Sequence, residues 1–180
     1  MSGATQPFSG AGGKGTRRSA LVFAVIAGLT LLADFATKRL AFSRLQPGEA
    51  YQIIPGLLAL RLSHNLGAVW GIGQGKGAFF ALFTLVAAAG ICWAAGRYGG
   101  GTRLLNAGLG LLLGGALGNL WDRLNRIFGE GQGVRDFIDA YVGPHHWPTF
   151  NVADSAICVG AALIMLHAFR EPAVKPDAPS

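Results

Sequence analysis

The chain has 180 residues, of which 51% are hydrophobic and only 13% are charged, and its mean hydropathy is +0.41. Soluble domains carry about 25% charged residues, so this composition argues against a soluble protein and indicates a chain surrounded largely by lipid. The formal net charge of +6 does not indicate nucleic-acid binding, because the basic residues are scattered between apolar blocks and form no patch. Attraction to anionic headgroups explains them better, so membrane lipid is an expected partner and nucleic acid is not.

Polar segments begin and end the chain. Residues 1–19 are rich in Gly, Ser and Thr and contain three basic residues, and residues 171–180 contain three prolines. Both segments are expected to be disordered tails, because they have too few apolar residues to form a core. Residues 20–170 between them have a length suited to one domain.

Four stretches between the tails are long and apolar enough to cross a bilayer, which takes about 20 apolar residues. In chain order they cover residues 20–42, 78–95, 104–121 and 150–169. They leave too little polar chain to enclose them in a soluble fold, so the sequence predicts an all-α membrane protein with four transmembrane helices. Gly110 and Gly114 in the third stretch form a G-x-x-x-G pattern, which predicts close helix packing.

Two polar segments, residues 43–77 and 122–149, connect the spans. The first contains two short extended-looking pieces, YQII and LLALRL, separated by Pro55–Gly56, which predict a small β element at the membrane surface. Lysine and arginine counts do not settle the orientation, but the basic residues ahead of the first span favour a cytoplasmic N-terminus. With four spans, both tails are then cytoplasmic, and both polar segments with the β element lie outside the cytoplasm.

Ionisable side chains inside a span are costly and by default point to function. Asp34 and Lys38 lie four residues apart near the end of the first span, so they share a helix face and can form an ion pair. We expect this pair to brace the helix end and to support a site rather than to react.

Polar residues also flank the apolar stretches. Asn65 lies in the turn-rich loop H-N-L-G-A-V-W-G and has both donors and acceptors for a peptide backbone. Asn119 and Arg123 are four residues apart at the end of the third span. Arg123 keeps its charge, so it requires a carboxylate, a phosphate or a lipid headgroup nearby, unless it only extends to the membrane surface.

Two carboxylates on separate segments are the strongest candidates for chemistry. Asp136 lies in V-R-D-F-I-D ahead of the fourth span, and Asp154 is followed at once by an apolar run. Asp154 could simply cap a helix. If the two carboxyl groups converge, they cannot both ionise and therefore share a proton, so one is a base that activates water and the other an acid that polarises the scissile carbonyl. This is peptide hydrolysis without a metal or a covalent intermediate, and no cofactor is expected.

Other hydrolytic chemistries fit the sequence less well. Ser155 has no histidine at a plausible position, because the four histidines lie in loops or at the far end of the fourth span. His64 has no partner carboxylate at metal-ligand spacing, and a site that combines His145–His146 with Asp136 does not match the usual spacings either. No metal site is therefore predicted.

Five motifs, taken in order, resemble those of the lipoprotein signal peptidase (signal peptidase II) family. They are D-x-x-x-K at Asp34–Lys38, N-L-G-A-V-W-G at Asn65–Gly71, G-N-L-W-D-R at Gly118–Arg123, V-R-D-F-I-D at Val134–Asp139 and F-N-V-A-D-S-A at Phe150–Ala156. Singly several are weak, but five in sequence on four spans are highly specific, and the resemblance covers nearly all of residues 20–170.

The resemblance implies four transmembrane helices in the bacterial inner (cytoplasmic) membrane, both termini in the cytoplasm and a small periplasmic β element. It also implies an aspartic endopeptidase whose partner is a lipid-modified prolipoprotein, cut just before its diacylglyceryl-modified cysteine. We expect the enzyme to act as a monomer.

The resemblance also assigns residues. By position, it makes Asp136 and Asp154 the catalytic pair. The residues that match polar or supporting groups of the family's site are Asn65, Asn119, Arg123, Asn151, Asp34 and Lys38. Residues 128–133, FGEGQG, make the loop before Asp136 longer than the family leads us to expect, and both a mobile lid and a plain surface insertion fit this segment.

Two other functions use the same residues. A small transporter or proton-conducting protein would employ Asp34, Lys38 and Asp154 as relay groups, but it predicts ionisable residues near mid-bilayer, whereas here they cluster at the outer ends of the spans. A structural assembly subunit built on the glycine-rich third span gives no reason for the Asn and Asp residues that recur in the polar segments. The protease is therefore the favoured function.

Overall fold

A computed structural model describes residues 12–67, 73, 75–98 and 102–170. Most of the predicted N-terminal tail and all of the C-terminal tail therefore lie outside the described residues. The same is true of residues 68–71, which end the loop motif that begins at Asn65.

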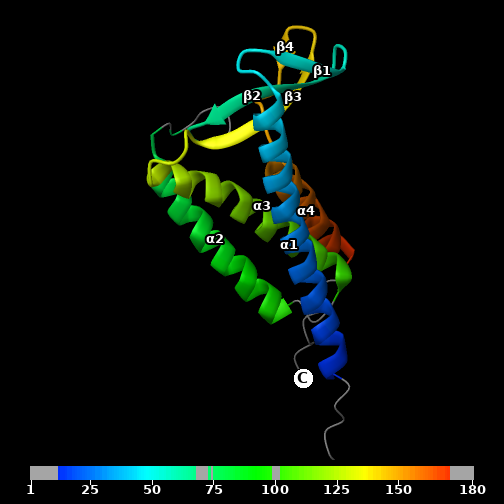
Figure 1. Ribbon diagram of the computed structural model, residues 1–180. Helices are drawn as coiled ribbons and strands as arrows, with labels where there is room; N and C mark the ends of the chain where they lie inside the picture. The colour runs from blue at the N-terminus through cyan, green and yellow to red at the C-terminus, as the bar shows by residue number, and fades with distance from the viewer. Residues whose placement is uncertain (1–11, 68–72, 74, 99–101, 171–180) are drawn as a thin grey trace, which may run out of the picture.

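Four helices form a bundle, with a small sheet at one end of it (Figure 1). The helices are α1 (Gly12–Arg44), α2 (Gly77–Tyr98), α3 (Arg103–Ile127) and α4 (Val152–Arg170). Each of them is long and apolar enough to cross a membrane. The prediction of four helices that are long and apolar enough to span a membrane is confirmed.

Large apolar side chains cover the outside of the bundle. Leu21 and Leu32 of α1 and Phe83 and Trp93 of α2 are all more than 60% exposed. Water would penalise such a surface, whereas lipid tails solvate it without cost. The outward apolar face therefore agrees with helices that lie in a bilayer.

The helices extend beyond the predicted spans. α1 begins at Gly12, so the last eight residues of the predicted tail, 12–19, are helical. α3 continues to Ile127, six residues past the expected end. Neither extension contains proline, and adding residues to an existing helix is far easier than nucleating a new one. As a result, Arg123 lies on a helix rather than in the following loop.

The sheet has four antiparallel strands in the order β1-β2-β3-β4. They are β1 (Ala50–Ile54), β2 (Leu58–Asn65), β3 (Val134–Val142) and β4 (His145–His146). β1 and β2 are the two predicted pieces, and Gly56 in the turn between them has a φ of 82°, which glycine adopts without strain. The prediction was incomplete, because β3 and β4 come from the second polar segment and complete the sheet.

α3 is the central helix, because it packs against α1, α2 and α4. Its glycines let two of these neighbours approach closely. A Cβ atom added at Gly114 would lie 2.5 Å from the carbonyl oxygen of Ala27 on α1, and one at Gly115 would lie 2.5 Å from that of Ala153 on α4. Both distances are too short for any real side chain, so these two positions set the spacing of three helices.

We therefore expect Gly114→Ala to lower the melting temperature of the purified protein, since α1 must move away from α3 to accommodate the methyl group. Overpacking of this kind costs about 1–3 kcal/mol. The control is Gly90→Ala on α2, where an added Cβ meets nothing within 4 Å. Thermal unfolding of both variants in detergent measures the effect, and equal melting temperatures would contradict the packing described.

Candidate active site

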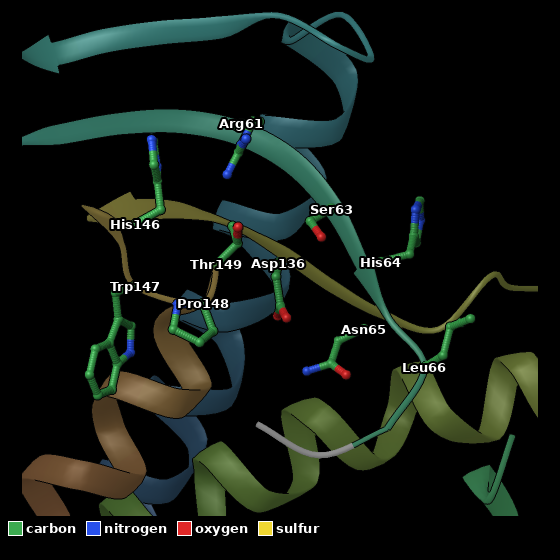
Figure 2. Close-up of a pocket in the computed structure, with 10 residues that line it drawn as sticks. All are labelled: Arg61, Ser63, His64, Asn65, Leu66, Asp136, His146, Trp147, Pro148 and Thr149. Carbon is green, nitrogen blue, oxygen red and sulfur yellow. The ribbon is translucent and has the colours of Figure 1, made fainter. Parts of the chain in front are cut away.

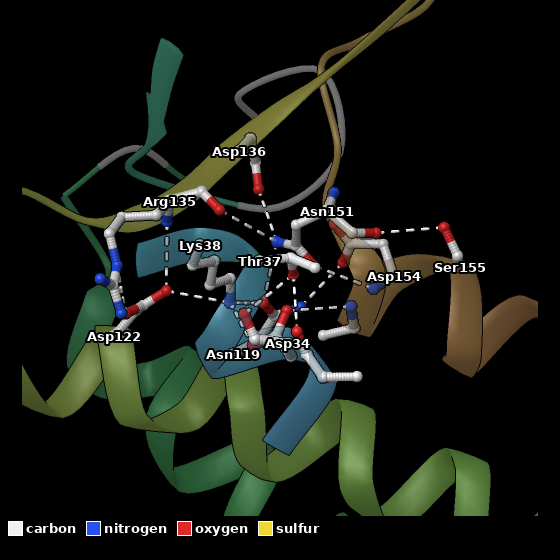
Figure 3. A network of polar contacts seen from close by, with 12 residues as sticks. Asp34, Thr37, Lys38, Asn119, Asp122, Arg135, Asp136, Asn151, Asp154 and Ser155 are labelled. Atoms are coloured by element: carbon white, nitrogen blue, oxygen red, sulfur yellow. Dashed lines mark hydrogen bonds and ion pairs between the residues drawn. The ribbon is translucent and has the colours of Figure 1, made fainter. Parts of the chain in front are cut away.

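A buried lysine lies at the centre of the polar groups in the bundle (Figure 3). Nζ of Lys38 is 2.7 Å from Oδ2 of Asp34, 3.0 Å from Oδ2 of Asp122 and 3.0 Å from Oδ1 of Asn119. The Lys38 side chain has no exposed surface. A lysine ammonium has three N–H donors and no acceptor, so these three partners use its full hydrogen-bonding capacity. The predicted pair of Asp34 and Lys38 is therefore formed, and it extends to α3.

Lys38 also fixes the orientation of the Asn119 amide. Because the ammonium can only donate, the Asn119 oxygen must face it. The Asn119 NH2 group then points the other way and donates to Oδ1 of Asp154 at 2.8 Å. A positive charge on α1 is thus connected to a carboxylate on α4 through one amide of α3.

Asn151 joins the two predicted catalytic aspartates. Its Nδ2 donates to Oδ1 of Asp136 at 2.6 Å, and the same group lies 3.1 Å from Oδ1 of Asn119. Its Oδ1 accepts from the backbone N–H of Asp154 at 3.0 Å, while its own backbone N–H donates to Oδ2 of Asp154 at 3.1 Å. Asn151 is therefore the N-cap of α4, and Asp154 is the reciprocal partner of a capping box.

The first turn of α4 is held from α1 as well. Oδ1 of Asp34 accepts from the backbone N–H of Ala153 at 3.1 Å. The first N–H groups of a helix have no partner within the helix, so this contact satisfies one of them. It also attaches the helix that carries Asp154 to the helix that carries Lys38.

β3 carries Asp136 and is attached to α3 by a pair that the sequence analysis did not select. Oδ1 of Asp122 accepts from Nε and Nη2 of Arg135 at 2.9 and 2.7 Å, and Oδ2 accepts from the Arg135 backbone N–H at 3.2 Å. This fork-shaped contact fixes the residue next to Asp136. Asp122 could have been found from its spacing, since it lies three residues after Asn119 and shares its helix face.

The environment of Asp136 favours its protonated form. The residue is only 2% exposed. The pKa of Asp136 is raised to about 7, first by burial and then by the negative charge of Asp154. The hydrogen bond from Asn151 and the charge of Lys38 act in the opposite direction. Asp136 therefore keeps its proton to a higher pH than an ordinary carboxyl group does.

The Asn65 side chain contributes a hydrogen bond that acts against the rise in the Asp136 pKa, whereas Arg123 lies beside the network. Asn65 ends β2 and lines a cavity of ≈ 520 Å³ together with Asp136 (Figure 2). The Arg123 guanidinium lies over the ring of Phe80, 5.8 Å from its centroid. Within the described part of the chain, no carboxylate forms an ion pair with Arg123, so the anion predicted for it is not an aspartate in direct contact.

Cavities of different character meet at the aspartates. A cavity of ≈ 570 Å³ between α2, α3 and α4 and another of ≈ 590 Å³ between α4 and residues 147–150 are mostly apolar, and both are lined by Arg123 and Asp154. The cavity lined by Asp136 and Asn65 lies at the sheet and is mostly polar. A chain that is apolar on one side of a peptide bond and polar on the other could therefore extend in both directions from this pair.

Other sequence alternatives take different positions. His146 contacts Asp139 at 2.8 Å rather than Asp136, and the Ser155 hydroxyl donates to the backbone oxygen of Asn151 at 3.1 Å. Across residues 17–67, 75–98 and 102–170 no group of three or more metal-ligating side chains is found. The 128–133 loop closes directly on the end of α3, where Glu130 N–H donates to the Asn125 oxygen at 2.8 Å.

Comparison with known proteins identifies the family. Residues 26–170 match the family model described as signal peptidase (SPase) II. The chain belongs to the signal peptidase II family. Membership makes this multi-pass membrane protein a peptidase.

Relatives of the signal peptidase II family match nearly the whole chain. A protein of Bacillus velezensis named lipoprotein signal peptidase is 37% identical over 157 residues, which cover 87% of this chain and 99% of the relative. A protein of the same name from Geobacillus kaustophilus is 41% identical over 144 residues, which cover 80% and 90%.

Two solved structures of bacterial membrane enzymes share the fold of this chain. One, described as a bacterial membrane enzyme at 2.3 Å resolution, matches with a TM-score of 0.73 and 27% identity, and the match covers 91% of this chain and 94% of that chain. A second bacterial membrane enzyme, at 1.9 Å resolution, matches with a TM-score of 0.70 and 28% identity, covering 87% and 95%.

The raised pKa of Asp136 predicts a pH-dependent stability. The unfolded carboxyl releases its proton near pH 3.8, whereas the folded one holds it to about pH 7. The folded state therefore binds more protons across this interval, and stability from this group falls as the pH rises from about 4 to 7. Asp136→Asn should remove the contribution of this carboxyl group to the loss of stability between about pH 4 and 7. The measurement is the melting temperature as a function of pH.

The control for this measurement is Glu130→Gln, which removes an exposed carboxyl from the loop after α3. We expect it to keep the wild-type profile. An Asp136→Asn profile that runs parallel to the wild type would show that the Asp136 carboxyl is not perturbed.

Proposed function

We propose that this protein is a membrane-embedded aspartic endopeptidase that removes the signal peptide from diacylglyceryl-modified prolipoproteins and cuts just before the lipidated cysteine. The observation that carries the proposal is the joining of Asp136 and Asp154 through Asn151 at the meeting point of polar and apolar cavities. The relatives named lipoprotein signal peptidase support the substrate class.

The surroundings of the two aspartates favour different charge states. Asp154 lies in the first turn of α4 and accepts N–H donors from Asn119 and Asn151, and helix N-termini favour negative charge. Asp136 is buried on β3, and its pKa of about 7 leaves it about half protonated at pH 7 and largely protonated below that pH. We therefore assign the base to Asp154 and the acid to Asp136 in the resting enzyme.

The reaction follows from these roles. Asp154 takes a proton from a water molecule as the water oxygen attacks the scissile carbonyl carbon, and Asp136 gives its proton to the carbonyl oxygen. The tetrahedral intermediate then collapses as one of its hydroxyl groups returns a proton to Asp136, the C–N bond breaks, and the proton held by Asp154 passes to the leaving nitrogen. The products are a carboxylic acid at the end of the signal peptide and a free amine on the cysteine, with water consumed and the dyad reset.

The cavities support the two halves of the substrate. The apolar cavities beside Arg123 and Asp154 suit the signal peptide and the acyl chains, and Arg123 offers a charge to the ester oxygens at the membrane surface.

All groups of the network come from one chain, which supports a monomeric enzyme. We place it in the bacterial inner membrane, with the sheet and the dyad on the periplasmic side and both termini in the cytoplasm.

Loss of either carboxylate should abolish cleavage. Asp136→Asn and Asp154→Asn keep nearly the same shape, and Asn still accepts the capping bond at position 154, but an amide cannot take a proton from the attacking water or alternate between acid and base. We expect turnover of a purified, lipidated preprolipoprotein to fall about 10³-fold or more in each single variant, with no further fall in the double variant, since the pair acts as one unit. Cleavage is followed on gels, alongside the yield of folded protein.

Asp139→Asn is the matched control, because Asp139 lies on the same strand but contacts Arg61 and His146 instead of Asn151. It should lose much less activity. Chelators should not inhibit. Robust cleavage by either dyad variant, or inhibition by a chelator that zinc reverses, would refute the mechanism.

The orientation is tested independently of the chemistry. Reporter fusions after Tyr98 and after Arg170 should give cytoplasmic signals, and fusions after Gln46 and after Gly131 should give periplasmic signals, because four spans return the chain to its starting side. A periplasmic signal after Tyr98 would rule out this topology.

A further inference from the structure

A second buried carboxylate on β3 is not part of the catalytic network. The Asp139 side chain is 2% exposed, and its two oxygens hold two different basic side chains. Oδ2 lies 3.2 Å from Nη2 of Arg61 on β2, and Oδ1 lies 2.8 Å from Nδ1 of His146 on β4. The ring of Tyr141 stacks on His146, with 4.8 Å between the ring centroids. Arg61 and His146 are therefore positioned side chains rather than freely moving ones.

Both basic side chains face the polar cavity that contains Asp136 (Figure 2). The cavity measures ≈ 520 Å³, and its lining includes Arg61 and His146 as well as Asp136. Ser63 of β2 is paired with Asp136 in the sheet. Arg61 precedes Ser63 by two residues, at an irregularity in the β2–β3 register. Two residues of a regular strand span about 6.6–7 Å, so an extended peptide at Asp136 reaches Arg61 within about two or three residues.

Arg61 and His146 both keep hydrogen-bonding groups for a ligand. A guanidinium has five N–H donors, and the contact with Asp139 involves only Nη2 of Arg61. His146 uses Nδ1 for Asp139, so Nε2 is the ring nitrogen that remains for a ligand. Both side chains are 42% exposed, so a ligand can reach them while the buried Asp139 carboxylate keeps them in position.

We propose that Arg61 and His146 form a subsite for the second and third residues of the mature lipoprotein, and that it favours acidic or hydrogen-bond-accepting side chains over basic ones. The inference rests on the proposed function. The signal peptide and the acyl chains occupy the apolar cavities at Asp154, so the polar cavity at the sheet receives the chain that follows the cut. A lysine there meets the Arg61 charge at close range, which selects against it.

The preference for acidic over basic substrates should be small, because Arg61 and His146 are partly exposed to solvent. Charge pairs at partly exposed sites contribute little, about 0.2–1 kcal/mol, and salt screens them. Because Asp139 already balances part of the charge, we expect a ratio of about 2–5-fold in kcat/KM between acidic and basic substrates at low salt. The difference should lie mainly in KM, since these contacts are made equally before and during the reaction.

The experiment uses three lipidated preprolipoproteins that carry Asp-Asp, Asn-Asn or Lys-Lys directly after the modified cysteine. The wild-type enzyme should cleave them with kcat/KM in the order Asp, Asn, Lys. Raising the salt concentration should bring the three values together. This comparison needs no protein variant, so a folding defect cannot confuse it.

Variants then assign the preference to Arg61. Arg61→Gln should bring the ratio of Asp to Lys substrate close to one, and Arg61→Lys should retain most of it, because the charge remains. The control is Arg44→Gln, an exposed basic residue at the end of α1 that does not line the cavity, and it should keep the wild-type ratio.

The outcomes separate the two proposals. If none of the three substrates is cut by wild-type enzyme, the proposed function fails. If all three are cut with equal kcat/KM, or if Arg61→Gln keeps the wild-type ratio, the function stands and the subsite is refuted. If Arg61→Gln does not fold, the subsite is tested by the wild-type enzyme, which should prefer the Asp substrate, and by Arg61→Lys, which should retain most of that preference.

Discussion

The site depends on the burial of one positive charge. Lys38 is fully enclosed, and its ammonium group has partners on its own helix and on α3. Removing one partner from such a buried arrangement typically costs about 3–5 kcal/mol, so α1 and α3 cannot slide or rotate relative to each other without a large loss of stability. Because the lysine can only donate, it also sets the direction of each hydrogen bond that leads to Asp154.

The rest of the site requires that three helices and one strand meet around this charge. Glycines at 114 and 115 of α3 let α1 and α4 approach closely enough for their polar ends to touch. The Asp122–Arg135 pair attaches β3 to α3, and Asn151 connects β3 to α4. The sheet is therefore part of the site, because its strand β3 carries Asp136 and places it in contact with Asn151 at the start of α4.

The same strand presents two carboxylates with different surroundings. Asp136 is buried and lies near the Asp154 carboxylate, so its pKa rises although its amide partners act in the opposite direction, and it is suited to hold a movable proton. Asp139, three residues along, has Arg61 and His146 as partners, so its charge is balanced by the Arg61 guanidinium and its second oxygen contacts the His146 ring. Alternation along a β-strand places neighbouring positions in separate environments, and this allows one short segment to serve chemistry and substrate recognition.

Composition and hydrophobic runs alone determined the four helices, because a bilayer requires long apolar segments whatever the tertiary fold. Local spacing also determined the pair of Asp34 and Lys38, since residues four apart on a helix must be neighbours. Only the tertiary structure decided the roles of Asp122 and Arg135 and the strand that carries Asp136, because these depend on contacts between segments that are distant along the chain. The sequence could not show that Asn151 links both aspartates, because that link exists only where β3 and α4 meet.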